Sequence, residues 1–247
     1  MRVLGIIPAR LGSTRLPNKP LQMLAGEPLI TRVIQRVQEH GLVDELVVAT
    51  DSPMVAQVVE RARVRAVLTS RSHLTGTDRV AEVAAKPEFA RFDTVVNVQG
   101  DEPFLAREAL AGAIERVAEG DDIGTAAAPL DPALAGDPAR VKVVTDARGR
   151  ALYFSRAAIP HLRDPGDLTP SLYWQHLGLY AYAGEALRRW SALEPCPAEL
   201  AERLEQLRAL HHGLRIGVAL LADPVEPGVD TPEDLRRAEA HWHALQR

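Results

Sequence analysis

Residues 3–20 read VLGIIPARLGSTRLPNKP, and this stretch contains the feature that decides the fold. Val3–Ile7 is an apolar run of strand length, and a polar loop from Pro8 to Pro20 follows it directly. A short apolar run bounded by turn residues is typical of a strand buried inside a sheet. The stretch therefore predicts a buried first strand that ends in a polar loop.

Similar runs recur through the first half of the chain, and helical patterns separate them. Three further strands are predicted at Glu45–Thr50, Val64–Thr69 and Thr94–Gln99. Between the first two strands, apolar residues fall at Ile30, Val33, Ile34 and Val37, which is the spacing of one helix face. Strands that alternate with single helices predict a predominantly parallel central sheet flanked by helices, the α/β class. In such a sheet, ligands bind beyond the carboxyl ends of the strands, so the loops after residues 7, 50, 69 and 99 should meet at one site.

The pattern changes after about residue 123. Predicted strands at Val141–Thr145, Ala151–Phe154 and His176–Tyr182 are joined by turns, which favours a small antiparallel sub-lobe at roughly residues 141–183. Helical patterns return at Ala198–Leu210 and Thr231–Leu245. No linker-like segment interrupts the chain, so we expect a single domain over residues 1–247 with this sub-lobe.

Composition and charge exclude several classes of protein. The net charge of -4 provides no basic surface for nucleic acid, and no run of twenty apolar residues is present to span a membrane. Cys196 is the sole cysteine, so no disulfide can form within the chain. We therefore expect a cytoplasmic protein that binds neither nucleic acid nor membrane.

The first loop has the composition of a phosphate-binding loop. Arg10, Arg15 and Lys19 lie within ten residues, and small residues separate them at Gly12–Thr14. A triphosphate needs backbone amides to contact its oxygens and cations to offset its charge. The loop matches neither the GxxxxGK[ST] nor the GxGxxG pattern, which disfavours a Walker NTPase or a dinucleotide fold. An ordinary polar surface loop is the alternative interpretation, and composition alone does not decide between the two.

The spacing R-x2-S-T-R-L-P-x-K-P in this loop resembles the N-terminal signature of sugar-acid cytidylyltransferases, and in particular of the CMP-Kdo synthetase family. Seven further segments match that family in order and extend the resemblance over nearly the whole chain: Thr75-Gly-Thr-Asp-Arg79, Asn97-Val-Gln-Gly-Asp-Glu-Pro103, Val141-Lys-Val-Val144, Ala151-Leu-Tyr-Phe-Ser-Arg156, His176-Leu-Gly-Leu-Tyr-Ala-Tyr182, Leu204-Glu-Gln-Leu-Arg208 and Gly228-Val-Asp-Thr-Pro-Glu-Asp234. The resemblance implies a nucleotide-diphospho-sugar transferase-like fold. It also implies CTP and 3-deoxy-manno-octulosonate (Kdo) as substrates, Mg²⁺ as cofactor, a homodimer and a role in lipopolysaccharide biosynthesis.

The same resemblance implies roles for individual residues. Catalytic roles fall on Arg10, Lys19 and Asp101, and Asp101 and Asp230 become the ligands of Mg²⁺. The implied nucleotide-binding residues are Pro8, Ala9, Arg10, Ser13, Arg15, Lys19, Thr69, Ser70, Arg71 and Thr77, of which residues 69–71 lie where the family binds cytosine and its ribose. Arg79 and Lys142 are further basic candidates. Without the resemblance, Asp101 is more simply a turn residue and Asp230 a helix-start acid.

The acidic-sugar pocket implied by the resemblance is formed by Gln99, Arg156, His176, Tyr180, Glu205 and Gln206. An arginine suits a substrate carboxylate through bidentate pairing, and the other side chains can exchange hydrogen bonds with sugar hydroxyls. Taken singly, His176 also reads as a core histidine, and Glu205 and Gln206 as a solvated helix face. Two alternatives stay open: a cytidylyltransferase for another acidic sugar, such as a sialic-acid-like nonulosonate or an amino-substituted Kdo, and a non-catalytic sugar- or nucleotide-binding relative.

Departures from the family pattern are modest. Asp137-Pro-Ala-Arg stands where the family more usually has Asn-Pro-Asn, and Ala183-Gly184 stands where an arginine is common. Neither departure touches the expected metal or triphosphate positions.

Overall fold

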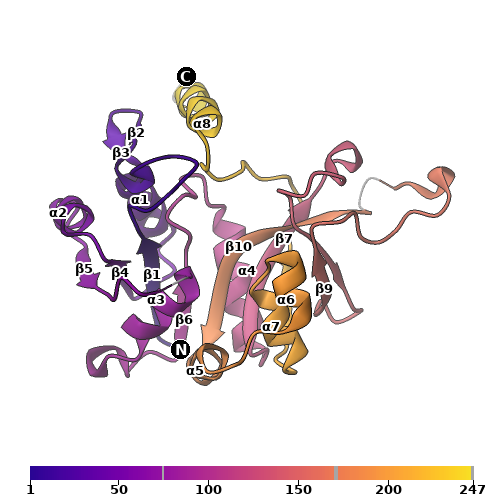
Figure 1. The fold of residues 1–247 in the computed structure, drawn as a ribbon, viewed down its shortest axis with the longest axis horizontal. Helices are drawn as coiled ribbons and strands as arrows, with labels where there is room; N and C mark the ends of the chain where they lie inside the picture. Colours follow the sequence, from indigo (N-terminus) through magenta and orange to yellow (C-terminus); the bar gives the residue numbers. More distant parts are fainter. Residues whose placement is uncertain (74, 170–171, 246–247) are drawn as a thin grey trace. The chain divides into compact units, whose positions relative to one another are not determined.

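The computed structural model describes residues 1–73, 75–169 and 172–245, and it divides the chain into two compact units. The first unit comprises Met1–Leu105 and Glu226–Arg247, and the second comprises Ala106–Val225. In Figure 1 the first unit is coloured indigo to purple, with its last helix in yellow, and the second magenta to orange. The expected sub-lobe at residues 141–183 falls inside the second unit. A single domain over the whole chain stays a prediction.

A parallel sheet forms the centre of the first unit. Its strands run in the order β6-β1-β4-β5, and their bounds are β1 Val3–Ala9, β4 Glu45–Thr50, β5 Arg65–Leu68 and β6 Thr94–Asn97. Ile6 of β1 pairs with Val47 on one side and with Asn97 on the other. All four predicted strands are therefore present, with ends shifted by up to two residues.

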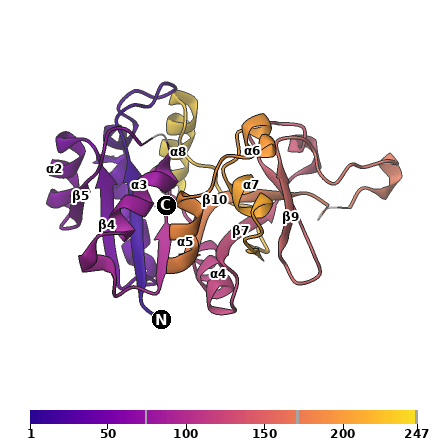
Figure 2. The ribbon, with the colours of Figure 1, turned by 60° about the horizontal axis from the view of Figure 1, so that its bottom comes forward.

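Helices cover both faces of this parallel sheet. These helices are α1 Leu29–His40, α2 Pro53–Arg61 and α3 Gly76–Ala84. Helix α8 Pro232–Leu245 instead contacts β2 of a small hairpin, β2 Met23–Leu24 and β3 Glu27–Pro28. Short 3-10 turns lie at Lys19–Leu21 and Pro87–Phe89. Helix α1 connects β1 to β4, and α2 connects β4 to the neighbouring β5. Helix α3 then leads the chain back past β4 and β1 to β6. Right-handed crossovers therefore place α3 on the face opposite α1 and α2, where it packs on β1 and β4 (Figure 2).

The helix predicted from the spacing of apolar residues after the first strand is confirmed. Ile30, Val33, Ile34 and Val37 are fully buried and form the core-facing side of α1, and burial of each such side chain stabilises the fold by about 1.5–3 kcal/mol. At the start of α2, the Ser52 hydroxyl accepts a hydrogen bond from the backbone amide of Val55.

The strand order of the first unit reverses between β6 and β1. From β1 the chain continues through α1 to β4 on one side, and only later enters β6 on the other side. The loops that follow β1 and β6 diverge at such a point and leave room for a ligand beyond the carboxyl ends of the strands.

The second unit contains the antiparallel part of the fold. Its elements are α4 Arg107–Ala118, β7 Ile123–Pro129, β8 Lys142–Thr145, β9 Ala151–Ser155, β10 Trp174–Ala183, α5 Gly184–Ser191, α6 Pro197–Glu202, α7 Gln206–His211 and β11 Ile216–Leu220, with 3-10 turns at Pro132–Leu134 and Pro165–Asp167. Strand β7 is parallel to β11 and antiparallel to β10, and β8 is antiparallel to β9. The predicted α/β class, with helices flanking a mainly parallel sheet and a smaller antiparallel part, is confirmed.

The helix predicted at Ala198–Leu210 is wrong in one respect, because it is two helices. Arg203 lies between α6 and α7 with φ 54°, in the left-handed region that a continuous helix cannot contain. Within the described residues, no helix is long and apolar enough to cross a membrane.

Candidate active site

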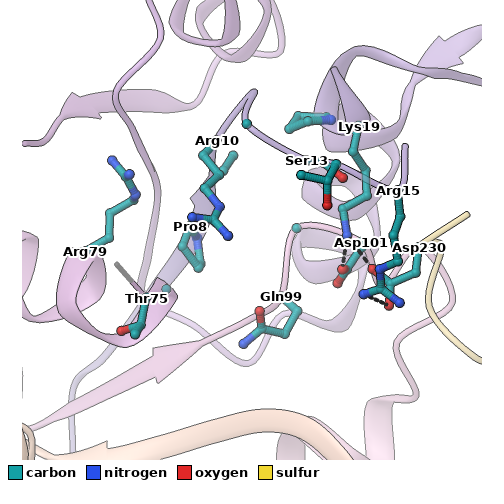
Figure 3. A pocket seen from close by; sticks show the side chains of 16 residues that line it. Pro8, Arg10, Ser13, Arg15, Lys19, Thr75, Arg79, Gln99, Asp101 and Asp230 are labelled. Carbon is teal, nitrogen blue, oxygen red and sulfur yellow. Dashed lines mark hydrogen bonds and ion pairs between the residues drawn. The ribbon is translucent and has the colours of Figure 1, made fainter. Parts of the chain in front are cut away.

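A cavity of about 340 Å³ lies within the first unit, at the carboxyl ends of β1 and β6 (Figure 3). Four segments line it: the end of β1 with the loop after it, the start of α3, the loop after β6, and the segment before α8. The lining residues are Pro8, Ala9, Arg10, Gly12, Ser13, Thr14, Arg15, Lys19, Pro20, Thr75, Gly76, Arg79, Gln99, Gly100, Asp101 and Asp230. The cavity is therefore at the reversal of strand order, where the topology provides space for a ligand.

The first loop has polar residues at the cavity, and one apolar side chain, Leu16, attaches it to the core. Leu16 is buried and packs in one cluster with Leu24, Leu29 and Val229. Because Val229 directly precedes Asp230, this cluster also holds the segment before α8 close to the first loop. The side chains of Arg10 and Arg15 stay exposed.

The loop after β6 lies against the end of β1 because residue 100 is glycine. A Cβ atom at Gly100 would lie 2.9 Å from the carbonyl oxygen of Pro8, which is closer than such atoms approach. This contact of the two backbones places Gln99 and Asp101 at the cavity.

A cluster of ion pairs forms one side of the cavity. The Lys19 ammonium donates a short hydrogen bond to Oδ2 of Asp101 and a second, of 2.9 Å, to Oδ1 of Asp230. Arg15 Nη2 lies 3.0 Å from Oδ2 of Asp230. Figure 3 shows these side chains converging from separate segments. Two carboxylates distant in sequence thus face one cation.

The charges in this cluster determine the protonation of its members. Burial lowers the pKa of Lys19, but the carboxylates of Asp101 and Asp230 outweigh that effect and raise it, so the ammonium stays charged. Neighbouring Glu102 is different: burial, and then repulsion from Asp101 and Asp230, raise its pKa to about 8 against the opposing effect of Lys19. Near neutral pH the cluster therefore holds a charged Lys19 beside a mostly protonated Glu102.

The paired aspartates fit a Mg²⁺ ion. Carboxylate oxygens are hard ligands that suit this cation, and Asp101 and Asp230 contact the same nitrogen atom, so their oxygens converge on a common point. Among the described residues, no group of three or more His, Cys, Asp or Glu side chains forms a metal cage. Mg²⁺ needs few protein ligands, because phosphate oxygens and water complete its coordination.

The structure brings only part of the expected nucleotide site to the cavity. Six of the expected residues line it: Pro8, Ala9, Arg10, Ser13, Arg15 and Lys19. Thr69, Ser70 and Arg71 follow β5 outside the lining, and Thr77 is buried in α3. Sequence reasoning missed Thr75 and Gly76. The signal was present, because Thr75 and Asp78 form a capping box that marks the start of α3.

The expected sugar residues lie in different units. Gln99 lines the cavity of the first unit, whereas Arg156, His176, Tyr180, Glu205 and Gln206 belong to the second. Within the second unit, Arg156 donates hydrogen bonds to the backbone oxygens of Pro138, Glu202 and Arg203. Arg156 is thereby attached to the α6–α7 segment, which also carries Glu205 and Gln206.

The two aromatic candidates of the second unit pack on each other. The rings of His176 and Tyr180 lie 5.4 Å apart, and a His176 ring nitrogen lies 3.0 Å from the Thr125 hydroxyl. Burial lowers the pKa of His176 to about 3, so its ring is neutral. Burial, with Tyr182 and Glu205 nearby, raises the pKa of Tyr180. Both side chains can therefore offer neutral hydrogen-bonding groups and no charge.

The α/β fold and the cationic loop facing paired aspartates are those of a nucleotidyltransferase. The family model described as cytidylyltransferase matches residues 4–216. A 3-deoxy-manno-octulosonate cytidylyltransferase from Gemmatimonas aurantiaca is 56% identical over 99% of this chain and 96% of its own length. The protein of the same name from Methylococcus capsulatus is 47% identical, over 96% and 95%.

A solved structure, that of a CMP:2-keto-3-deoxy-manno-octonic acid synthetase complexed with CTP, matches with a TM-score of 0.92 at 36% identity, over 99% of this chain and 100% of that one. The chain belongs to the 3-deoxy-manno-octulosonate cytidylyltransferase family. The family resemblance noted in the sequence, and the nucleotidyltransferase activity that accompanies it, are confirmed.

Proposed function

We propose that this protein transfers CMP from CTP to Kdo, with release of pyrophosphate, and so supplies CMP-Kdo for lipopolysaccharide biosynthesis. The observation that carries the proposal is the convergence of Lys19, Asp101 and Asp230 in a cavity that Arg10 and Arg15 also line. The names of the relatives support the choice of CTP and Kdo.

Triphosphate binding falls to the first loop and the start of α3. Arg10, Arg15 and Lys19 offset the charge of the phosphates, and the small side chains of Gly12–Thr14 let a phosphate approach the loop closely. The amino end of α3 adds the positive end of its dipole. A triphosphate held this way has its phosphates next to the paired aspartates.

Asp101 and Asp230 are the residues that would hold Mg²⁺. When bound there, the ion supplies charge neutralisation at the α-phosphate and lowers the pKa of the attacking sugar hydroxyl. Arg10 and Lys19 add positive charge where the transferring and leaving phosphates gain negative charge.

The reaction is an in-line displacement. The 2-hydroxyl oxygen of Kdo forms a bond to the α-phosphorus of CTP, the bond from that phosphorus to the bridging oxygen of pyrophosphate breaks, and the hydroxyl proton passes to solvent. Positioning and charge neutralisation provide most of the catalysis in such transfers. No covalent intermediate on the protein is required.

The acidic sugar is assigned to Gln99 and to the second-unit residues Arg156, His176, Tyr180, Glu205 and Gln206. Arg156 supplies a cation for the substrate carboxylate, and the neutral rings of His176 and Tyr180 supply hydrogen-bonding groups for hydroxyls. The nucleotide is assigned to the cavity residues of the first loop together with Thr69, Ser70, Arg71 and Thr77.

Pyrophosphate release from CTP tests the proposal. The assay contains Mg²⁺ with either Kdo or N-acetylneuraminate, each with and without EDTA. Release that requires both Kdo and free metal is expected. Equal release with N-acetylneuraminate would move the substrate to another acidic sugar, and no release with any acidic sugar would favour a non-catalytic nucleotide-binding protein.

A cytoplasmic location and a homodimer complete the proposal. The single cysteine, which is buried and free, suits a reducing compartment. Light scattering coupled to size-exclusion chromatography tests the homodimer, for which a mass of twice 26.9 kDa is expected.

A further inference from the structure

Arg79 of α3 connects two loops that follow neighbouring strands of the first unit. Its side chain is buried, with 2% of the residue exposed. Nη1 donates a short hydrogen bond to the Thr69 hydroxyl and a longer one, of 3.4 Å, to the carbonyl oxygen of Ser70. Nη2 donates to Oδ2 of Asp51 at 3.0 Å. Because Asp51 follows β4 and Thr69 follows β5, one guanidinium fixes the distance between the two strand ends.

Glu82, three residues further along α3, contacts the same loop from the other side. Its Oε2 accepts a hydrogen bond of 2.9 Å from the backbone amide of Ser70 and contacts the ring of His73. The backbone amide and carbonyl of Ser70 are thus bonded to a carboxylate and a guanidinium from the same helix. Helix α3 therefore fixes the backbone of the loop of residues 69–71 through both polar groups of Ser70.

The same helix also forms part of the cavity. Thr75 and Gly76 at its amino end line the cavity, as does Arg79. Figure 3 shows Arg79 on the Thr75 side of the cavity, away from Lys19 and the two aspartates. Helix α3 therefore links the wall of the phosphate site to residues 69–71.

Stability alone is a weak reason for this arrangement. Exchanging a buried arginine–carboxylate pair for apolar residues is often neutral or stabilising, because both charges lose their hydration. The guanidinium of Arg79 donates three hydrogen bonds, all to residues that follow β4 and β5. Its position fits a role in holding the loop rather than in touching the substrate.

We infer that Arg79 and Glu82 are positioning residues that fix residues 69–71 against the nucleoside of CTP and thereby set the preference for cytosine. The inference rests on the proposed function, which assigns Thr69, Ser70 and Arg71 to the nucleotide. It adds the residues that make this otherwise exposed loop rigid enough to discriminate between bases.

Steady-state kinetics with CTP and UTP test the inference, on the wild type and on Arg79→Met, Arg79→Lys, Thr69→Val and Glu82→Met. Arg79→Met should raise KM for CTP about tenfold, as expected for loss of charged hydrogen bonds, and leave kcat and KM for Kdo within about threefold. The ratio of kcat/KM for CTP to that for UTP should fall about fivefold or more. Arg79→Lys should recover part of both effects, because an ammonium can bond to either loop but does not span the two. Thr69→Val and Glu82→Met each remove one contact between α3 and residues 69–71. Both should change KM for CTP and the CTP/UTP ratio of kcat/KM in the same direction, by smaller amounts.

Arg116→Met is the matched control. Arg116 forms an ion pair of 2.6 Å with the buried Asp121 in the second unit, so its loss should lower the melting temperature while KM for CTP and the base ratio stay unchanged. If Arg79→Met lowers the melting temperature as Arg116→Met does but leaves the base ratio unchanged, the residue is structural and the inference is overturned. If Arg79→Met does not fold, Glu82→Met decides by the same ratio, because Glu82 holds the loop without being assigned to the nucleotide.

Calorimetric titration with CTP·Mg²⁺ and UTP·Mg²⁺ in the absence of sugar separates this inference from the proposed function. If the wild type binds CTP but fails to use Kdo, the proposed substrate is wrong, and the base preference in binding still tests Arg79. If the variants bind CTP and UTP in the wild-type ratio while the wild type turns over Kdo, the positioning role fails and the proposed function stands.

Discussion

At the scale of single residues, Lys19 is the group on which the active-site cluster depends. It contacts both Asp101 and Asp230, and these carboxylates keep it charged. Lys19→Met removes that charge and should lower kcat/KM for CTP by about 10²–10³-fold, the usual cost of losing one charge-stabilising group. Pyrophosphate release under saturating Kdo measures the change.

The control for Lys19 is Arg236→Met on α8. Arg236 is an exposed cation that pairs with Glu233, so its removal should change kcat/KM less than twofold. Activity of Lys19→Met above one third of the wild type would show that the ammonium does not act on the reacting phosphates.

His176 provides a prediction about pH and stability. The folded protein holds it neutral, with a pKa of about 3 against an ordinary value of 6.5. Below pH 6.5 His176 becomes protonated in the unfolded chain but stays neutral in the folded chain. The free energy of unfolding therefore falls as pH falls, and the loss continues towards pH 3. Replacing His176 by Gln should remove a dependence of about 1.4 kcal/mol per pH unit in this window. Urea unfolding at pH 4.5, 5.5 and 7 measures the difference.

His211→Gln is the matched control for this experiment. His211 is exposed at the end of α7, so the variant should keep the pH dependence of the wild type. A wild type and a His176→Gln variant with parallel stability curves from pH 7 to 4.5 would contradict the assignment of a neutral, buried ring.

The residues of the first loop could be predicted from sequence because cations and small residues lie together there in sequence. Thr75 and Gly76 could not be selected in that way. Their place at the cavity depends on the crossover of α3, which only the folded chain creates. The meeting of Asp101 with Asp230 was inferred from the family resemblance and not from spacing.

At the scale of elements, the packing of α4 on β7 depends on one missing side chain. A Cβ atom at Gly124 would lie 1.9 Å from the backbone oxygen of Ala113, so helix and strand touch through their backbones. Gly124→Ala must push α4 away from β7 and should lower the free energy of unfolding by about 1–3 kcal/mol, the usual cost of overpacking a core. Chemical denaturation monitored by circular dichroism measures it.

Gly136→Ala serves as the control for the α4–β7 contact, because no atom lies within 4 Å of the position of its Cβ. This variant should stay within about 0.5 kcal/mol of the wild type. If the two variants were equally stable, the close approach of α4 and β7 would not be a constraint on the fold.

The elements that sequence predicted well are those whose signal is local. β1 lies within two residues of its predicted bounds, and the four apolar residues predicted to form one helix face all lie in α1. The break between α6 and α7 was not predictable, because Arg203 has no sequence preference for its left-handed backbone. α3 was not predicted, because its buried residues include Thr77 and Arg79, whose burial depends on contacts with distant segments.

At the scale of the whole molecule, most of the residues proposed to bind the nucleotide and most of those proposed to bind the sugar belong to different units of the chain. The triphosphate and metal residues belong to the first unit, and five of the six sugar candidates belong to the second. Binding of CTP·Mg²⁺ at 100 times its Kd should therefore stabilise the protein by about 2.7 kcal/mol, a rise of several degrees in melting temperature, without help from the sugar residues.

Arg156→Lys tests this division. The Arg156 guanidinium bonds to three separate backbone oxygens, and a lysine ammonium lacks the planar fork that reaches all of them while facing a carboxylate. KM for Kdo should rise about tenfold, whereas the rise in melting temperature with CTP·Mg²⁺ should match the wild type.

The exposed Arg163→Lys is the control and should change neither quantity. If Arg156→Lys instead weakened the CTP-induced rise and left KM for Kdo unchanged, the arginine would belong to the nucleotide site, and the acidic group of the sugar would need another cation. Lys142 is not a substitute, because its ammonium is bonded to the backbone oxygens of Asp137, Arg140 and Arg156.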